Sequence, residues 1–297
     1  MVTGSIVFDR IMDFSGSFKD HILPEKIHML NVAFVINTLK ESFGGTAGNI
    51  AYGLSLLEER PILLGVVGRD FDIYAKWLEK NNIDISKIKK DETTTTASAY
   101  ITTDENNNQI TAFHPGPTDV RYCEIIRDIK DIELAIVSPD FKGRMVRFAE
   151  IFKELKIPYI FDPGQQITSF TKSELEFLIN NSKVLIGNDY EIDLIQKIMG
   201  IQKGALENMV EVLIVTKGAA GSVLIKKGEV MKIMPAKIDK IVDPTGAGDA
   251  YRSGLIKGLI EGWDWEKIGK LASLVSAQAV MKQGTQNHFF NYKDLSI

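Results

Sequence analysis

The sequence has little cysteine and no long apolar run, and both absences narrow what the protein can be. Cys123 is the one cysteine among 297 residues, so no intrachain disulfide can form and a reducing compartment is expected. No apolar stretch approaches the ~18 residues of a transmembrane helix. Residues 1–7 lack the charged start and the apolar core of a signal peptide. We therefore expect a cytoplasmic protein without a membrane partner.

Charge and composition indicate an ordinary globular protein. The net charge is −4, and lysine and arginine are spread along the chain without a basic block, so no nucleic-acid partner is expected. Hydrophobic residues make up 44% and charged residues 25%, which is typical of globular domains. A chain of this length can bury a core that needs no disulfides, in one large α/β domain or two smaller ones.

Several motifs of common enzyme classes are missing. The chain has no G-x-x-x-x-G-K-[ST], which excludes a P-loop kinase, and no G-x-G-x-x-G after a strand, which counts against a dinucleotide enzyme. It also lacks the paired Cys and His spacing of zinc sites and the G-x-S-x-G of hydrolases. Any catalytic site must therefore be sought in the other glycine-rich segments.

Apolar runs of strand length alternate with helical periodicity from about residue 61 onward. The apolar runs are continuous, as expected for strands that are covered on both faces. This rhythm predicts an α/β fold with a doubly wound, mostly parallel sheet flanked by helices, in which ligands lie beyond the carboxyl ends of the strands. The expected strands are 1–7, 62–67, 134–138, 157–161, 183–187 and 212–216, and the expected helices are 49–57, 73–78, 144–155, 172–179, 190–199, 250–260 and 271–280.

Two regions interrupt this rhythm and predict a small β-rich lid. Residues 13–43 contain short mixed segments that fit no single helix, and residues 93–115 read as two strands around a hairpin turn at 104–108. Such an insertion either forms a side sheet over the active site or decorates one edge of the main sheet. We expect the first arrangement, within a single domain spanning 1–297. The open edges of lid strands also make a homodimer a candidate assembly.

The stretch 243–250, Asp-Pro-Thr-Gly-Ala-Gly-Asp-Ala, carries the strongest indication of chemistry. It places a turn of small residues before a helix-like apolar run. Gly246 and Gly248 let backbone amides approach an anion closely, and a helix N-terminus adds unpaired N–H groups and partial positive charge. Asp249 lies beside this anion hole, where a carboxylate can take a proton from an attacking hydroxyl. The arrangement predicts a phosphoryl-transfer site.

A second glycine cluster, Gly44-Gly45-Thr46-Ala47-Gly48-Asn49, precedes another helix-like run. Its glycines allow a small molecule to press against the backbone, and the Asn49 side chain offers both a donor and an acceptor. Asp9 follows a short strand, where its carboxylate either accepts hydroxyl hydrogen bonds from a ligand or caps a turn. Each of these patterns also occurs in plain turns, so neither identifies a site when taken alone.

Taken together, these segments resemble the ribokinase-like (PfkB-type) superfamily of carbohydrate and nucleoside kinases. The resemblance covers essentially the whole chain, with the motifs in the superfamily's order, and segments 9–12, 21–24 and 45–52 look most like the prokaryotic adenosine and nucleoside kinases. Pro244-Thr245 stands where many members have Thr first, which is a common variant. The similar segments are Gly4-Ser5-Ile6-Val7-Phe8-Asp9, Gly44-Gly45-Thr46-Ala47-Gly48-Asn49, Val67-Gly68-Arg69-Asp70, Asn188-Asp189-Tyr190-Glu191, Thr216-Lys217-Gly218-Ala219-Ala220-Gly221 and the stretch 243–249.

The resemblance implies roles on the acceptor side of the site. Asp249 would be the general base that accepts the hydroxyl proton while the oxygen attacks the γ-phosphorus. Gly246, Ala247 and Gly248 would supply the anion hole. His114 would either touch the acceptor or be an ordinary turn residue. The residues implied in acceptor binding are Asp9, Gly44, Gly45, Asn49 and Phe113.

The resemblance also implies ATP and Mg²⁺ as cofactors and raises K⁺ as a further candidate. Glu191, together with Asn188, would organise Mg²⁺ largely through water, and the adenine would lie between the loop 238–242 and the helix 271–280. Glu191 as a helix cap and Lys217 as a solvated loop charge are the plain alternatives. The residues implied in nucleotide binding are Asn188, Thr216, Lys217, Gly218 and Gly221.

The resulting prediction is an ATP-dependent kinase that phosphorylates the 5′-hydroxyl of a nucleoside, with adenosine as the first candidate and a broad acceptor range left open. A sugar or sugar-phosphate kinase of the same superfamily is the alternative, because the motifs do not fix the acceptor pocket. A ligand sensor without catalytic activity would be expected to have lost Asp249 or the anion-hole glycines, and the sequence retains both.

Overall fold

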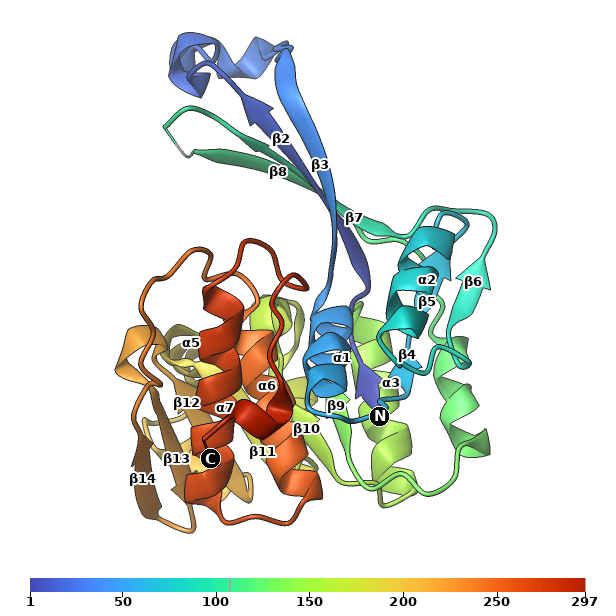
Figure 1. Ribbon diagram of the computed structural model, residues 1–297, viewed down its shortest axis with the longest axis vertical. Helices are drawn as coiled ribbons and strands as arrows, with labels where there is room; N and C mark the ends of the chain where they lie inside the picture. Colours follow the sequence, from blue (N-terminus) through green and yellow to red (C-terminus); the bar gives the residue numbers. More distant parts are fainter. Residues whose placement is uncertain (107, 297) are drawn as a thin grey trace.

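An eight-stranded sheet forms the body of the protein in a computed structural model that describes residues 1–106 and 108–296 (Figure 1). Its strands are β1 (Val2–Thr3), β4 (Leu63–Leu64), β9 (Ala135–Val137), β10 (Tyr159–Phe161), β11 (Val184–Asn188), β12 (Val212–Thr216), β13 (Ser222–Lys226) and β14 (Glu229–Ile233). They follow the order β14-β13-β12-β11-β10-β9-β1-β4. All pairs from β12 to β4 are parallel, whereas β13 and β14 pair antiparallel at one edge. The predicted mostly parallel sheet is confirmed.

Helices cover both faces of this sheet, which explains the continuous apolar runs of its strands. Val184 and Ile186 of β11 belong to one core cluster, and Leu185 between them belongs to the other. The first cluster includes residues of α1, α2, α6 and α7, and the second includes residues of α3, α4 and α5. The helices are α1 (Thr46–Leu56), α2 (Asp72–Lys80), α3 (Lys142–Glu154), α4 (Lys172–Asn180), α5 (Asp189–Met199), α6 (Ala247–Ile260) and α7 (Trp265–Val280).

A separate four-stranded sheet projects from one end of the body (Figure 1). It consists of β2 (Val7–Phe14), β3 (Ile36–Gly44), β7 (Ala97–Thr103) and β8 (Gln109–His114), in the order β3-β2-β7-β8. The 3-10 turns η1 (Phe18–Asp20) and η2 (Pro24–Met29) lie between β2 and β3 in the chain. The predicted hairpin turn at 104–108 contains Asn107, which lies outside the described residues; β7 and β8 on either side of it pair antiparallel.

Two predicted strands are interrupted, and both interruptions shape the site. The strand expected at 1–7 ends at Thr3, because the chain leaves the large sheet, donates a hydrogen bond from the Ser5 N–H to the Pro139 carbonyl (2.9 Å), and starts the small sheet at Val7 rather than near residue 13. The strand expected at 62–67 breaks at Gly65 into β4 and β5 (Val66–Gly68), and β5 pairs with β6 (Lys89–Asp91). Apolar residues on both sides of each break hide it from the sequence pattern.

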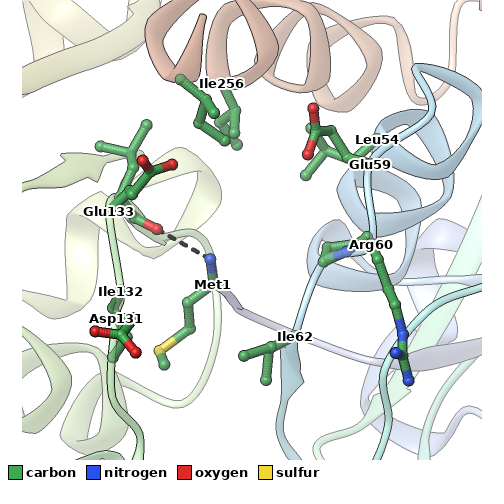
Figure 2. A pocket seen from close by; sticks show the side chains of 12 residues that line it. Met1, Leu54, Glu59, Arg60, Ile62, Asp131, Ile132, Glu133 and Ile256 are labelled. Carbon is green, nitrogen blue, oxygen red and sulfur yellow. Dashed lines mark hydrogen bonds between the residues drawn. The ribbon is translucent and has the colours of Figure 1, made fainter.

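The amino end of the large sheet carries a cavity that is unrelated to the predicted site. This cavity, of about 490 Å³, is lined by residues that include Met1, Glu59, Arg60 and Glu133 (Figure 2). The Met1 amino group donates a hydrogen bond to the Leu134 carbonyl (2.9 Å). All the predicted site residues lie elsewhere. No helix in the described part of the chain is long and apolar enough to cross a membrane.

Candidate active site

Three adjoining cavities lie at the carboxyl end of the large sheet, around the N-terminus of α6. The first, of about 660 Å³, lies between the small sheet and the large one. The second, of about 600 Å³, runs over the loops after β10, β11 and β12, and the third, of about 370 Å³, lies against α7. Gly246 and Asp249 line both the first and the second cavity, and Gly248 lines both the second and the third. The three cavities therefore meet at the glycine turn 246–248.

The predicted site residues are divided among these three cavities according to their predicted roles. Most of the predicted acceptor residues line the first cavity: Asp9, Gly45, Asn49 and Phe113. The second cavity is lined by Asn188, Glu191, Thr216, Lys217 and Gly218. Gly221 and Ala247 line the third, together with Ile238 and Ile241 of the loop and Ala277 and Val280 of α7 that were expected to surround adenine. Gly44 and His114 line none of the three.

Asp249 lies in the first turn of α6, and one oxygen of its carboxylate is hydrogen-bonded within the protein. The Asn49 Nδ2 donates a hydrogen bond to its Oδ2 (2.8 Å), whereas its Oδ1 accepts no hydrogen bond from any described residue. Burial raises the pKa of Asp249 to about 6, although the Asn49 hydrogen bond and the Arg252 guanidinium act in the opposite direction. A carboxylate with one anchored and one open oxygen is suited to accept a proton from a hydroxyl in the first cavity.

The glycine turn before α6 lines the second cavity and leaves two backbone amides without a partner among the described residues. Gly246 has a φ of 78°, a conformation that favours glycine, and the Gly246 and Gly248 N–H groups have no hydrogen-bond acceptor among the described residues. The Ala247 N–H donates instead to the Pro244 carbonyl (3.2 Å). Ala247 therefore differs from the prediction, because its amide closes the turn and its residue faces the third cavity.

Asp9 lies on β2 and faces the first cavity from the small sheet. Its carboxylate accepts no hydrogen bond from the described residues, and burial raises its pKa to about 6. Gly44 explains how this carboxylate fits, since a Cβ at position 44 would lie 2.2 Å from the Asp9 Oδ2. Gly44 is buried next to Asp9 and does not line the cavity, so the structure gives it no direct access to an acceptor there and shows instead that a side chain at this position would clash with Asp9.

The first cavity is lined by both polar and apolar side chains. Asp9, Asn49 and Asp249 are among the polar ones. Val66 and Phe113 contribute apolar surface to the same cavity, along with Ala97 and Ala99 of β7. Phe113 is 57% exposed on β8, the outer strand of the small sheet, and pairs with Ala99 in the sheet.

Asn188 and Glu191 form a helix cap and also line the second cavity. The Asn188 Oδ1 accepts a hydrogen bond from the Glu191 N–H (2.8 Å), and the Glu191 Oε2 accepts one from the Asn188 N–H (2.7 Å). Glu191 therefore caps the N-terminus of α5, as the plain alternative predicted. Its Oε1 accepts no hydrogen bond from the described residues. Burial raises the pKa of Glu191. Lys217 is exposed at the same cavity, and its N–H donates to the Gly221 carbonyl (2.8 Å).

A buried ion pair lies next to Asp249, and the sequence analysis did not predict it. The Arg252 Nε and Nη2 donate to the two oxygens of Asp162 (2.6 and 2.7 Å), and its Nη1 donates to the Gly248 carbonyl (3.0 Å). Both side chains are almost fully buried and line the second cavity. The signal was present in the sequence, because Asp162 directly follows a predicted strand and Arg252 stands one helical turn after Asp249.

This fold, with an acid at a glycine-rich helix N-terminus, defines the class of the protein. The model of the pfkB family carbohydrate kinases matches residues 7–290, so the chain belongs to this family. It is an ATP-dependent kinase, as the sequence predicts. A sensor without catalytic activity is thereby set aside.

Within this family, the chain is similar to nucleoside kinases. It is 32% identical to the nucleoside kinase of Methanocaldococcus jannaschii over 269 residues, or 89% of this chain and 87% of that protein. The structure of Burkholderia thailandensis nucleoside kinase in complex with inosine has a TM-score of 0.86 at 36% identity and covers 99% of this chain and 94% of that chain. The complex of that kinase with ADP-inosine gives 0.84 at 37% identity, covering 99% and 92%. The predicted resemblance to PfkB-type nucleoside kinases is confirmed.

Proposed function

We propose that this kinase transfers the γ-phosphoryl group of ATP to the 5′-hydroxyl of a nucleoside, with adenosine as the first candidate acceptor. The observation that carries the proposal is that Asp249 lines both the first and the second cavity, and that its Oδ1 accepts no hydrogen bond from the described residues. An acceptor in the first cavity and a triphosphate in the second would meet at this carboxylate. Phosphoryl transfer requires mainly such alignment, together with stabilisation of charge.

In this proposal the chain acts through three groups at the junction. Asp249 takes the hydroxyl proton, and the Gly246 and Gly248 amides stabilise the charge that builds on the transferring oxygens. A general base contributes about 10²–10⁴-fold to the rate, and one donor of an oxyanion hole contributes about 10²–10³-fold. Thr216 and Gly218 would contact the nucleotide phosphates, Lys217 would reach them as an exposed charge, and Gly221 would shape the third cavity for the adenine.

The second cavity fits Mg²⁺ bound mainly by phosphate and water. No group of three or more His, Cys, Asp or Glu that could hold a metal occurs in residues 1–106 and 108–296. Mg²⁺ commonly takes one or two carboxylates plus substrate phosphates and keeps several waters. Glu191 would supply the carboxylate through its Oε1, with Asn188 beside it, and a bound Mg²⁺ would neutralise phosphate charge. K⁺ stays a candidate activator, testable by exchanging it for Na⁺ in the assay.

The mixed polar and apolar lining of the first cavity favours a nucleoside over a free sugar. A ribose can place its hydroxyls against Asp9 and its 5′-hydroxyl at Asp249, while a planar base covers Val66 and Phe113. A free sugar would leave that apolar surface uncovered. The test is a panel of nucleosides, ribose, fructose and phosphorylated hexoses, followed by ADP release. Turnover restricted to the sugars would contradict the proposal.

The role of Asp249 is tested by Asp249→Asn, with Asp193→Asn as a matched control on the exposed face of α5. We expect the first substitution to lower kcat by about 10²–10⁴-fold with acceptor and ATP binding retained, because the proton acceptor is lost while the shape is kept. The control should leave kcat unchanged. Equal turnover of Asp249→Asn and the unmodified enzyme would remove Asp249 as the base.

We further propose that the small sheet is a lid that closes over the acceptor and excludes water. A closing lid predicts that ATP hydrolysis without acceptor is slow, which a comparison of ADP release with and without nucleoside measures. The edge strands β3 and β8 also offer unpaired backbone groups through which two copies could associate. Sedimentation that finds only monomer at assay concentrations would dispose of the dimer.

A further inference from the structure

A chain of hydrogen bonds leads from α2 to Asp249 through Trp77 and Gln286, which no motif singles out, and through Asn49 of the second glycine cluster. The Trp77 Nε1 donates to the Gln286 Oε1 (2.9 Å), and the Gln286 Nε2 donates to the Asn49 Oδ1 (3.0 Å). The Asn49 Nδ2 then donates to the Asp249 Oδ2 (2.8 Å). Gln286 and Asn49 are buried, with 3% and 6% of their surface exposed. Residues far apart in the sequence thus form one continuous path that ends at the base.

The direction of every bond in this path is fixed at its start. An indole N–H can only donate, so Trp77 must face the oxygen of the Gln286 amide, and the Gln286 nitrogen must face Asn49. Tyr74 fixes the same direction independently. Its hydroxyl donates to the Gly44 carbonyl (2.9 Å), which can only accept, and therefore receives the second bond of the Gln286 Nε2 (2.6 Å). The amide of Asn49 is consequently held with its nitrogen toward Asp249.

We infer that Trp77 and Gln286 are positioning residues that keep Asn49 locked as a donor to Asp249 and so hold the base in its ionised, outward-facing state. A proton on the Oδ2 of Asp249 would find an acceptor only if Asn49 turned its oxygen toward it. That rotation would bring the Asn49 nitrogen against the Gln286 nitrogen, two donors facing each other. The path therefore excludes a proton from Oδ2 and gives that oxygen a donor, which bonds more strongly to the ionised carboxylate than to the protonated carboxyl group.

Charged groups around Asp249 also act on its pKa. Asp9 faces it from β2 and Asp162 from the loop after β10, and both disfavour its ionisation. Arg252, on the same helix, favours it. The Tyr74 phenol of α2 is neutral, since burial raises its pKa. Among the described residues, Asp9, Asp162 and Arg252 make no hydrogen bond to Trp77 or Gln286, so substitutions there leave these three charges in place. Gln286→Met removes one hydrogen bond of Tyr74, whose hydroxyl still donates to the Gly44 carbonyl.

The test is the pH dependence of kcat/KM for Gln286→Met and Trp77→Phe. Methionine keeps the volume of glutamine but cannot fix Asn49, so the protonated base gains a partner. We expect the acid limb to move up by about one pH unit, the size of one hydrogen bond made by one protonation state. Phenylalanine keeps the stacking of Trp77 on Phe43 and Tyr52 and should move the limb in the same direction by less, because Tyr74 still holds Gln286.

Trp263→Phe is the matched control, because Trp263 is also a half-buried indole packed against the same core but lies outside the path. It should leave the limb in place. A uniform loss of activity at all pH values in Gln286→Met and Trp77→Phe, with the limb unmoved, would overturn the inference and leave a structural role. The inference rests on the proposed function, and Asp249→Asn separates the two: if that variant is inactive while the limb stays fixed in both path variants, only the inference fails.

Discussion

Replacing Asp9 by asparagine tests whether the small sheet supplies an ionised group to the acceptor. Burial raises the pKa of both Asp9 and Asp249 to about 6. If both must be ionised, log kcat/KM should fall with a slope of two below that pH. A carboxyl with a pKa of 6 is about one-eleventh ionised at pH 5, so one group costs about tenfold there and two cost about a hundredfold. Asp9→Asn removes one of the two titrations and should reduce the slope by one.

The same substitution also has an effect at neutral pH. An ionised carboxylate forms stronger hydrogen bonds to hydroxyls than an amide does, so we expect kcat/KM for the acceptor to fall by about 10- to 100-fold at pH 8, with KM for ATP unchanged. The deficit relative to the unmodified enzyme should shrink by about tenfold between pH 8 and pH 5, because only the unmodified enzyme loses the Asp9 charge.

The assay is ADP release at saturating Mg²⁺ and ATP, with nucleoside varied, from pH 5 to 8.5. The terminal phosphate of ATP also titrates near pH 6, but it contributes equally to both enzymes. Asp13→Asn is the control, because Asp13 lies on the same strand and accepts a hydrogen bond from Thr38 outside the cavity. An unchanged slope for Asp9→Asn, or a change confined to KM for ATP, would refute the placement of the acceptor.

Three further predictions concern other parts of the site and core. Arg252→Met should lower the unfolding free energy by about 3–5 kcal/mol, because it leaves Asp162 buried without its partner, and the added change Asp162→Leu should restore most of it in urea titrations. Glu191→Gln should raise the Mg²⁺ concentration needed for half-maximal rate while KM for the acceptor stays constant, since glutamine still caps α5. An unchanged Mg²⁺ requirement would contradict a role of Glu191 in binding Mg²⁺. Burial lowers the pKa of His288 to about 4 from its ordinary 6.5, so the unfolded state binds the proton first and stability is lost as the pH falls between these values. His288→Leu should abolish up to about 3 kcal/mol of that loss, and equal pH dependence in both proteins would contradict it.

Sequence reasoning located some elements of the body almost to the residue. The run at 212–216 became β12 without a change in bounds, and the helix expected at 172–179 became α4 with one added residue. The breaks at Gly4 and Gly65 were missed, because a strand that changes sheets keeps its apolar pattern. The antiparallel strands β13 and β14 were also missed; β14 is mostly exposed and shows no continuous apolar run.

For the site, local motifs were readable and long-range partners were not. The glycine turn and Asp249 form one contiguous signal, so their proximity follows from the sequence. The partner of Asn49 stands 237 positions away at Gln286, and no spacing rule connects the two. Gly44 and Ala247 match the motif in residue type, but Gly44 lies against the Asp9 carboxylate and the Ala247 N–H bonds to the Pro244 carbonyl; both contacts depend on how neighbouring segments fold back.

The crossing at residues 4–6 has a mechanical consequence. The carboxylate of Asp9 belongs to the projecting sheet, and that of Asp249 belongs to the body, so a molecule bonded to both ties two separately built layers together. In the proposed function, an acceptor bonded to both carboxylates would therefore use part of its binding energy to fix the orientation of the small sheet on the body. An acceptor too short to reach both would leave that orientation unfixed, so selectivity would depend on whether the acceptor spans the two sheets.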